Sequence, residues 1–185
     1  MVLSMFDQHP VLEFRVDSLN VTSMKVYKSI RDYYSIVQDK KRVTADFDVT
    51  LTLTNKGEEV LDFDPLQVSL EYHQDEILSP TSIVPFLLHE GQQQPVQFGM
   101  QIKDDARLRN ETVDSMSQDL WDEHVVQFDL KGQGHYVRLR DDDFTKCKIK
   151  ILCNDIKVGF SLANNLRSGS MIGNPILCKW ESICL

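Results

Sequence analysis

Residues 45–78 read ADFDVTLTLTNKGEEVLDFDPLQVSLEYHQDEIL, and the alternation within this stretch decides the fold class. Apolar side chains occupy every second position from Phe47 to Leu53, and again from Leu66 to Tyr72, with polar residues between them. Because successive side chains of a strand point to opposite faces, each run predicts a strand with one apolar face. Residues 55–57, Asn-Lys-Gly, interrupt the pattern with residues that favour turns. We therefore expect two antiparallel strands joined by a polar connection.

Other parts of the chain show the same period of two. The first strand is expected to contain a bulge, because its alternation shifts phase between Val16 and Leu19. The glycines at 132 and 134 predict a turn between two later strands. The further strands predicted in this way lie at 12–26, 96–102, 126–130, 136–139, 147–153 and 156–160.

One segment has a different period. In residues 104–124, DDARLRNETVDSMSQDLWDEH, the side chains of Val113, Met116 and Leu120 recur at helical spacing. This pattern predicts one short helix with Asp104 or Asp105 near its N-cap.

The whole chain, residues 1–185, is predicted to form a single domain. Seven or eight strands at roughly regular spacing, with one short helix, are typical of an all-β fold. We expect a two-sheet antiparallel β-sandwich of the immunoglobulin or fibronectin kind. Residues 7–10 are expected to be an irregular entry to the first strand.

The charge of the chain argues against nucleic-acid binding. Twenty basic and 28 acidic residues give a net charge of −8, whereas a nucleic-acid binder needs a basic surface. Lys146, Lys148 and Lys150 come nearest to such a surface. They alternate with Cys147 and Ile149, so we interpret them as the solvated outer face of a strand.

The length of the apolar runs decides whether the sequence predicts a membrane-spanning helix. A spanning helix needs about 18 or more apolar residues in a row, and this sequence has no such run. The opening MVLSMF is too short for a signal peptide and fits equally well the tail end of a membrane segment whose start is missing, with residues 7–10 as the remnant that follows such an anchor.

The four cysteines lie at the C-terminal end of the chain and allow three pairings. If 147–153 is one strand, its ends are about 20 Å apart, too far for a disulfide between Cys147 and Cys153. The residue numbers of Cys147 and Cys184 have the same sum as those of Cys153 and Cys178, as expected of partners in one antiparallel register. One disulfide, two disulfides and buried free thiols all stay open, while the spacing disfavours zinc.

Two sequons agree with an oxidising, secretory environment. Asn20-Val21-Thr22 and Asn110-Glu111-Thr112 each carry the acceptor pattern for N-linked glycosylation. We predict glycosylation at Asn20 and Asn110.

Several segments resemble one plant family. They are EFRVDSLNVTSM (13–24), the pair at 46–78, VPFLLHEGQQQPVQFGMQI (84–102), KCKIKILCNDIKVGF (146–160) and GNPILC (173–178). Together they resemble the late-embryogenesis-abundant group-two domain, in particular its harpin-induced and non-race-specific disease-resistance-like branch. The family's Asn-Pro-Asn type of turn reads Asn-Lys-Gly at residues 55–57 of this chain.

The resemblance implies a β-sandwich on the extracellular face of the plasma membrane, tethered by an N-terminal transmembrane helix that is absent from this chain. It also implies a part in defence signalling, the hypersensitive response and stress. Cys153 and Cys178 match the family's late cysteine pair, which implies a disulfide between them. Cys147 and Cys184 have no evident family counterpart, and a second disulfide between them remains open.

No catalytic, cofactor-binding or metal-binding motif is evident in the sequence. Gly169–Gly173 resembles a nucleophile elbow, but its serine stands one place too early. Asp141–Asp143 is interpreted as a solvated turn rather than a calcium site, and Trp121 and Trp180 as core anchors. No two histidines have metal-ligand spacing; they are His9, His73, His89, His124 and His135.

We therefore expect a non-catalytic interaction module without a cofactor, whose partner is a protein of the plasma membrane or a component of the cell wall. Two other functions stay open. The chain is then either a carrier of lipid or another small apolar ligand, or a soluble protectant against desiccation stress in the cytoplasm.

Overall fold

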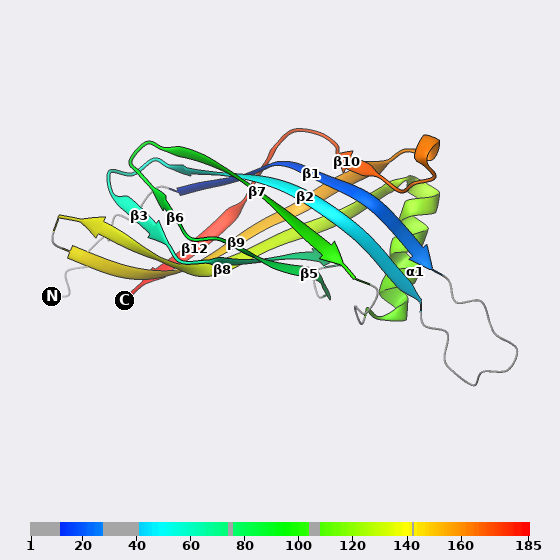
Figure 1. Ribbon diagram of the computed structural model, residues 1–185, viewed down its shortest axis with the longest axis horizontal. Coiled ribbons are helices and arrows are strands. Elements are labelled where there is room, and N and C mark those ends of the chain that lie inside the picture. Colours follow the sequence, from blue (N-terminus) through cyan, green and yellow to red (C-terminus); the bar gives the residue numbers. More distant parts are fainter. Residues whose placement is uncertain (1–11, 28–40, 74–75, 104–107, 142) are drawn as a thin grey trace, which may run out of the picture.

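The computed structural model describes residues 12–27, 41–73, 76–103, 108–141 and 143–185 (Figure 1). Most of these residues are in strands, and the all-β class with one short α-helix is confirmed. The entry at residues 7–10 and the candidate N-caps Asp104 and Asp105 lie outside the described residues. The strands are β1 Leu12–Tyr27, β2 Arg42–Asn55, β3 Val60–Phe63, β4 Leu66–Tyr72, β5 Glu76–Ile83, β6 Phe86–Leu88, β7 Gln93–Ile102, β8 Val125–Arg140, β9 Asp143–Phe160, β10 Gly169–Met171, β11 Ile176–Leu177 and β12 Lys179–Cys184.

The strands form one continuous antiparallel sheet that curls into a nearly closed barrel. Its main path runs β5-β4-β8-β9-β10-β1-β2-β7. The two end strands of this path touch, since the Ser79 hydroxyl of β5 donates to the Gln101 carbonyl of β7 over 2.9 Å. The finer expectation, two separate sheets packed as a sandwich, stays a prediction.

The helix lies at one end of the barrel, opposite the β8–β9 hairpin (Figure 1). Helix α1 spans Asn110–Gln118, begins after Arg109 and continues into a π-helical turn at Asp119–Glu123. Val113, Met116 and Leu120 are buried, as their helical spacing predicts. Trp121 is 58% exposed, so its assignment to the core is wrong. The helix turns only one narrow face to the barrel, and Trp121, one position after the buried Leu120, lies outside that face and is exposed to solvent.

The first pair of strands follows the sequence pattern closely. β1 pairs with β2 along almost its whole length, with register shifts between Val16 and Ser18 and between Thr22 and Lys25. The bulge predicted for the first strand is therefore present. β2 ends at Asn55, whose fully buried amide donates to the carbonyls of Glu59 and Leu88 and whose Oδ1 accepts from the Gly57 amide. These contacts explain why the strand stops at this turn.

The turn predicted at residues 132–134 is absent, and β8 runs straight through it. A Cβ on Gly134 would lie 2.6 Å from Leu66 Cδ2 and 3.3 Å from the Pro65 carbonyl oxygen. Gly134 thus allows close packing of β4 against β8 and does not form a turn. Likewise β9 continues from Asp143 to Phe160, and residues 154–155 form a bulge rather than a break, with Asp155 at φ 61°.

Gly169 provides a direct test of this packing. A Cβ at this position would lie 2.7 Å from the Gly159 carbonyl oxygen and 2.9 Å from Val158 Cγ1, so the backbone of β9 or β10 must move. We expect Gly169→Ala to lower the free energy of unfolding by about 1–3 kcal/mol. Gly99→Ala is the matched control, because its nearest contact is an ordinary 3.8 Å to the Phe47 carbonyl oxygen. Equal urea midpoints for the two variants would contradict the close approach.

Candidate functional site

Two disulfides bracket the last strand. Cys153 is bonded to Cys178, directly before β12, and Cys147 is bonded to Cys184, the last residue of β12. β12 therefore cannot separate from β9 while both bonds are intact. Its register has Lys179 opposite Leu152 and Cys184 opposite Cys147, the register that the equal residue sums predict.

Other contacts hold β12 on its inner side. The Trp180 indole packs edge-on against Phe14, with ring centroids 6.3 Å apart, and its Nε1 donates to the Leu12 carbonyl over 2.8 Å. The Cys178 amide donates to the Phe14 carbonyl over 2.9 Å. Trp180 is half-buried and packs on the core, as the sequence predicts for it.

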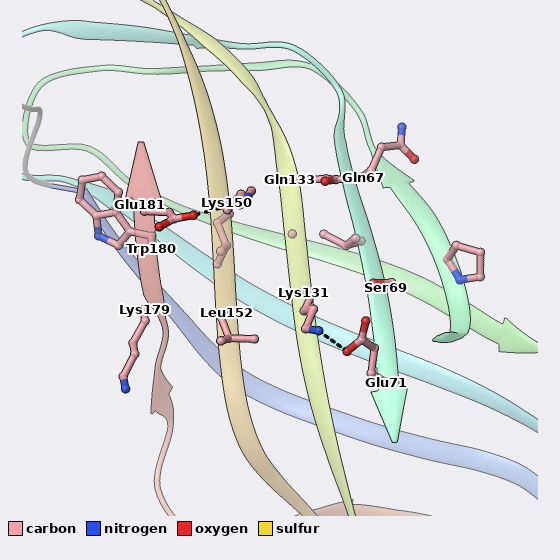
Figure 2. Close-up of a pocket in the computed structure, with 14 residues that line it drawn as sticks. Gln67, Ser69, Glu71, Lys131, Gln133, Lys150, Leu152, Lys179, Trp180 and Glu181 are labelled. Atoms are coloured by element: carbon pink, nitrogen blue, oxygen red, sulfur yellow. Dashed lines mark ion pairs between the residues drawn. The ribbon is translucent and has the colours of Figure 1, made fainter. Parts of the chain in front are cut away.

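On the outer side of the same strands lies a groove of about 770 Å³, which we call the outer groove (Figure 2). It crosses β12, β9, β8 and β4, with Glu181 and Lys179 on one side and Gln67, Ser69 and Glu71 on the other. Neighbouring positions on these strands point alternately into the barrel and out of it, so the groove is lined mainly by the outward-facing half of each alternating run, with Val68, Ile151 and Trp180 also at its surface.

Two ion pairs lie in the outer groove, and they differ in strength. Lys131 Nζ lies 2.6 Å from Glu71 Oε2, and the Glu71 side chain is only 7% exposed. This oxygen accepts no other hydrogen bond from the described residues, so the lysine is what compensates its charge. Lys150 and Glu181 are 3.5 Å apart and mostly exposed, so their pair adds little stability. No ion pair of Lys179 occurs among the described residues.

Uncharged donors and acceptors complete the outer groove. Gln67 and Gln133 are direct cross-strand neighbours and both are exposed. The Gln67 amide donates to the Ser82 hydroxyl over 3.2 Å, which leaves further hydrogen-bonding capacity in both side chains. Leu152 adds an apolar surface between these polar groups. The groove thus offers amides, paired charges and an apolar contact on rigid strands.

A second hollow of about 720 Å³ lies near the π-helical turn. The Tyr72 hydroxyl donates to Asp119 Oδ2 over 2.7 Å, and Asp129 Oδ1 accepts from the Asp155 amide over 2.9 Å. These carboxylates therefore hold the helix and the β9 bulge in place. Within the described ranges no three His, Cys, Asp or Glu side chains are placed to hold a metal ion.

Tyr72 makes the fold sensitive to alkali. Burial, reinforced by the hydrogen bond and the charge of Asp119, raises the pKa of the Tyr72 hydroxyl far above its usual range. In the unfolded chain tyrosine ionises near pH 10, so above that pH the unfolded state loses a proton that the folded state keeps. The stability contribution of Tyr72 is therefore complete below about pH 10 and falls by up to about 1.4 kcal/mol per pH unit above it.

The measurement is a series of urea unfolding curves between neutral pH and strongly alkaline pH. Tyr72→Phe should be less stable than the parent at neutral pH, because Asp119 loses its donor, but should show a shallower alkaline loss. Burial also raises the pKa of Tyr136, so some alkaline loss remains in this variant. Parallel alkaline slopes for parent and variant would refute the assignment to Tyr72.

Both predicted glycosylation sites are exposed. Asn20 stands in β1 between Asp48 of β2 and Ser170 of β10, and Asn110 is the first residue of α1. Neither asparagine lines the outer groove.

The other residues noted in the sequence do not come together. His73, His89 and His135 are exposed, His124 is half-buried, and His9 lies outside the described residues. Asp141 is exposed in the turn between β8 and β9. Ser170, the serine of the elbow-like motif, lies in strand β10. Glu59, which follows the turn at residues 55–57, pairs at 2.5 Å with Arg138, and both side chains are mostly buried.

The sequence alone does not reveal the outer groove, because its residues come from five strands and share no motif. The only signal is the polar half of the alternating runs, and that signal is common to every half-exposed strand. No described helix is long and apolar enough to cross a membrane.

Comparison with known proteins gives little. No protein-family model matches the chain, and no curated protein matches it. One solved structure, described as a protein from Archaeoglobus fulgidus, is similar with a TM-score of 0.34 and 7% sequence identity. The similarity covers 89% of this chain and 97% of that one.

Proposed function

We propose that this chain is a non-catalytic binding domain that works at the extracellular face of the plasma membrane, where its outer groove contacts a protein or a cell-wall component. One observation carries the proposal. β12, which supplies one side of the groove, is bonded covalently to β9 at both of its ends. Such bonds keep a binding surface rigid before its partner arrives, which lowers the entropy lost on binding.

The disulfides also support the proposed location. Disulfides persist in oxidising compartments such as the extracellular space and are rare in the cytosol. The exposed sequons at Asn20 and Asn110 agree with passage through the secretory pathway. The resemblance to the late-embryogenesis-abundant group-two domain supports a role in defence and stress signalling. We also propose that the strands of this domain form two packed sheets, as in immunoglobulin domains.

The chemistry of the outer groove favours recognition. Gln67 and Gln133 offer side-chain amides that accept and donate hydrogen bonds, and Lys179 offers an exposed charge. Gln67, Gln133 and Lys179 stand on β4, β8 and β12, which β9 joins in one fixed register, and this arrangement suits a ligand that spans several strands. The ion pair of the buried Glu71 with Lys131 holds both side chains in place within the groove.

The test is binding of the oxidised domain to isolated plasma-membrane proteins and to wall polysaccharides. We expect the variant Gln67→Ala, Gln133→Ala, Lys179→Glu to bind at least about tenfold more weakly than the parent. Lys25→Glu with Gln97→Ala, on β1 and β7, is the matched control and should bind like the parent. Equal binding by the groove variant, or no binding by the parent to either fraction, would reject the proposal.

A further inference from the structure

The outer face of the sheet near the β8–β9 hairpin is unusually apolar. Phe144 is 71% exposed, Ile183 66% and Leu87 49%, and Leu185 is almost fully exposed. They stand on β9, β12 and β6, with Leu185 directly after β12, on the side opposite the buried Cys147, Leu61 and Leu88. We call this surface the hairpin-end face. An outer sheet face is normally polar, so several large, exposed apolar side chains on one such face indicate a contact surface.

The charges of the hairpin-end face are arranged in order across the strands. One row runs Leu185, Lys146, Val137, Asp62, Leu87, because each residue is the cross-strand neighbour of the next. The next row has Lys148 on β9 opposite His135 on β8, and the Asp64 amide donates to the His135 carbonyl. Basic residues therefore lie on the β9 side of β8, and acidic residues lie on its β3 side.

This order is complementary to itself. A two-fold axis that lies in the contact plane, parallel to β8 near Val137, places the β9 side of one copy against the β3 side of the other. Lys146 and Lys148 then face Asp62 and Asp64 of the second copy, and Leu185 faces Leu87. The strands of the two copies run nearly parallel, which is the usual geometry of packed sheets. We propose that the hairpin-end face binds a second copy of this chain in a two-fold symmetric dimer.

Two other occupants fit the face less well. An anionic bilayer would be repelled by the carboxylates of Asp62 and Asp64, which lie beside the apolar side chains. An unrelated protein would bury Lys146 and Lys148 within the contact, whereas interface cores are depleted of lysine unless it is paired. Within one copy Lys146 makes an exposed contact of 3.6 Å with Asp64, which costs little to exchange for the partner copy.

The experiment is sedimentation equilibrium of the full oxidised chain and of two charge variants. Lys146→Asp with Lys148→Asp makes the face wholly acidic, and Asp62→Lys with Asp64→Lys makes it wholly basic. We expect the parent to dimerise and each variant alone to dimerise at least about a hundredfold more weakly, since like charges then face each other. An equimolar mixture of the two variants should form a heterodimer with an affinity close to that of the parent.

The mixture of the two variants distinguishes loss of the proposed contact from other causes of weakened dimerisation, such as misfolding. All four substituted side chains are exposed, so circular dichroism and the thermal midpoint should match those of the parent. Asp48→Lys with Lys157→Asp, exposed positions outside the face, is the control and should dimerise like the parent. A monomeric parent, unchanged dimerisation of either variant, or a mixture that fails to associate would overturn the proposal. So would a monomeric parent that sediments with phosphatidylglycerol vesicles, which would place a bilayer on this face.

Discussion

Removal of both disulfides, by serine at all four cysteine positions, is expected to lower the free energy of unfolding by about 6 kcal/mol. The bonded residues are 25 and 37 positions apart, and the loop of Cys153–Cys178 lies inside that of Cys147–Cys184. Each bond closes a loop in the unfolded chain and, with the other bond intact, adds about 3 kcal/mol to the free energy of unfolding. A loss of this size approaches the whole stability of many domains, so the variant should be largely unfolded at 37 °C.

The measurement compares urea unfolding of the parent, each two-serine variant and the four-serine variant. The two-serine variants act as controls for each other, since each keeps one end of β12 attached to β9. Hydrogen exchange of the β12 amides should accelerate in both. A four-serine variant with the urea midpoint of the parent would contradict the account, and parent-like partner binding by that variant would contradict the role of β12 in the outer groove.

The second large effect is expected from Phe128→Ala, which should lower the free energy of unfolding by about 3–5 kcal/mol. Phe128 is 1% exposed, and its ring lies edge-on to Phe47 of β2 with centroids 5.5 Å apart. Its ring centroid also lies 6.5 Å from that of Tyr72 on β4, so this one side chain packs against residues of both β2 and β4. The neighbouring bulge of β9, held by Asp129, limits how far the strands can collapse into the cavity.

Urea unfolding again measures this effect, with two comparison variants. Phe128→Leu keeps most of the volume and should cost less than about 1.5 kcal/mol. Trp121→Ala removes a larger but 58% exposed side chain and should stay within about 0.5 kcal/mol of the parent. If Phe128→Ala were no more destabilising than Trp121→Ala, the barrel would not depend on this contact.

The candidate site was predictable only in part. The equal sums of two cysteine pairs favour the register of the last strand that the structure shows, but the sequence left one disulfide, two disulfides and free thiols open. The outer groove is different: Gln67 and Gln133 are 66 positions apart by residue number and meet only because β4 pairs with β8. The self-complementary charges of the hairpin-end face likewise depend on which strands flank β8.

The amino-acid sequence by itself determined the period of two in each strand, the helical spacing from Val113 to Leu120, and therefore the all-β class with one helix. These are local properties, set by how successive side chains alternate. The tertiary structure alone decided that Gly134 serves close packing within a strand, that β8 and β9 run unbroken, and that Trp121 faces solvent. The physical reason is that each of these outcomes depends on neighbours far away in sequence, which packing brings into contact and which no local pattern records.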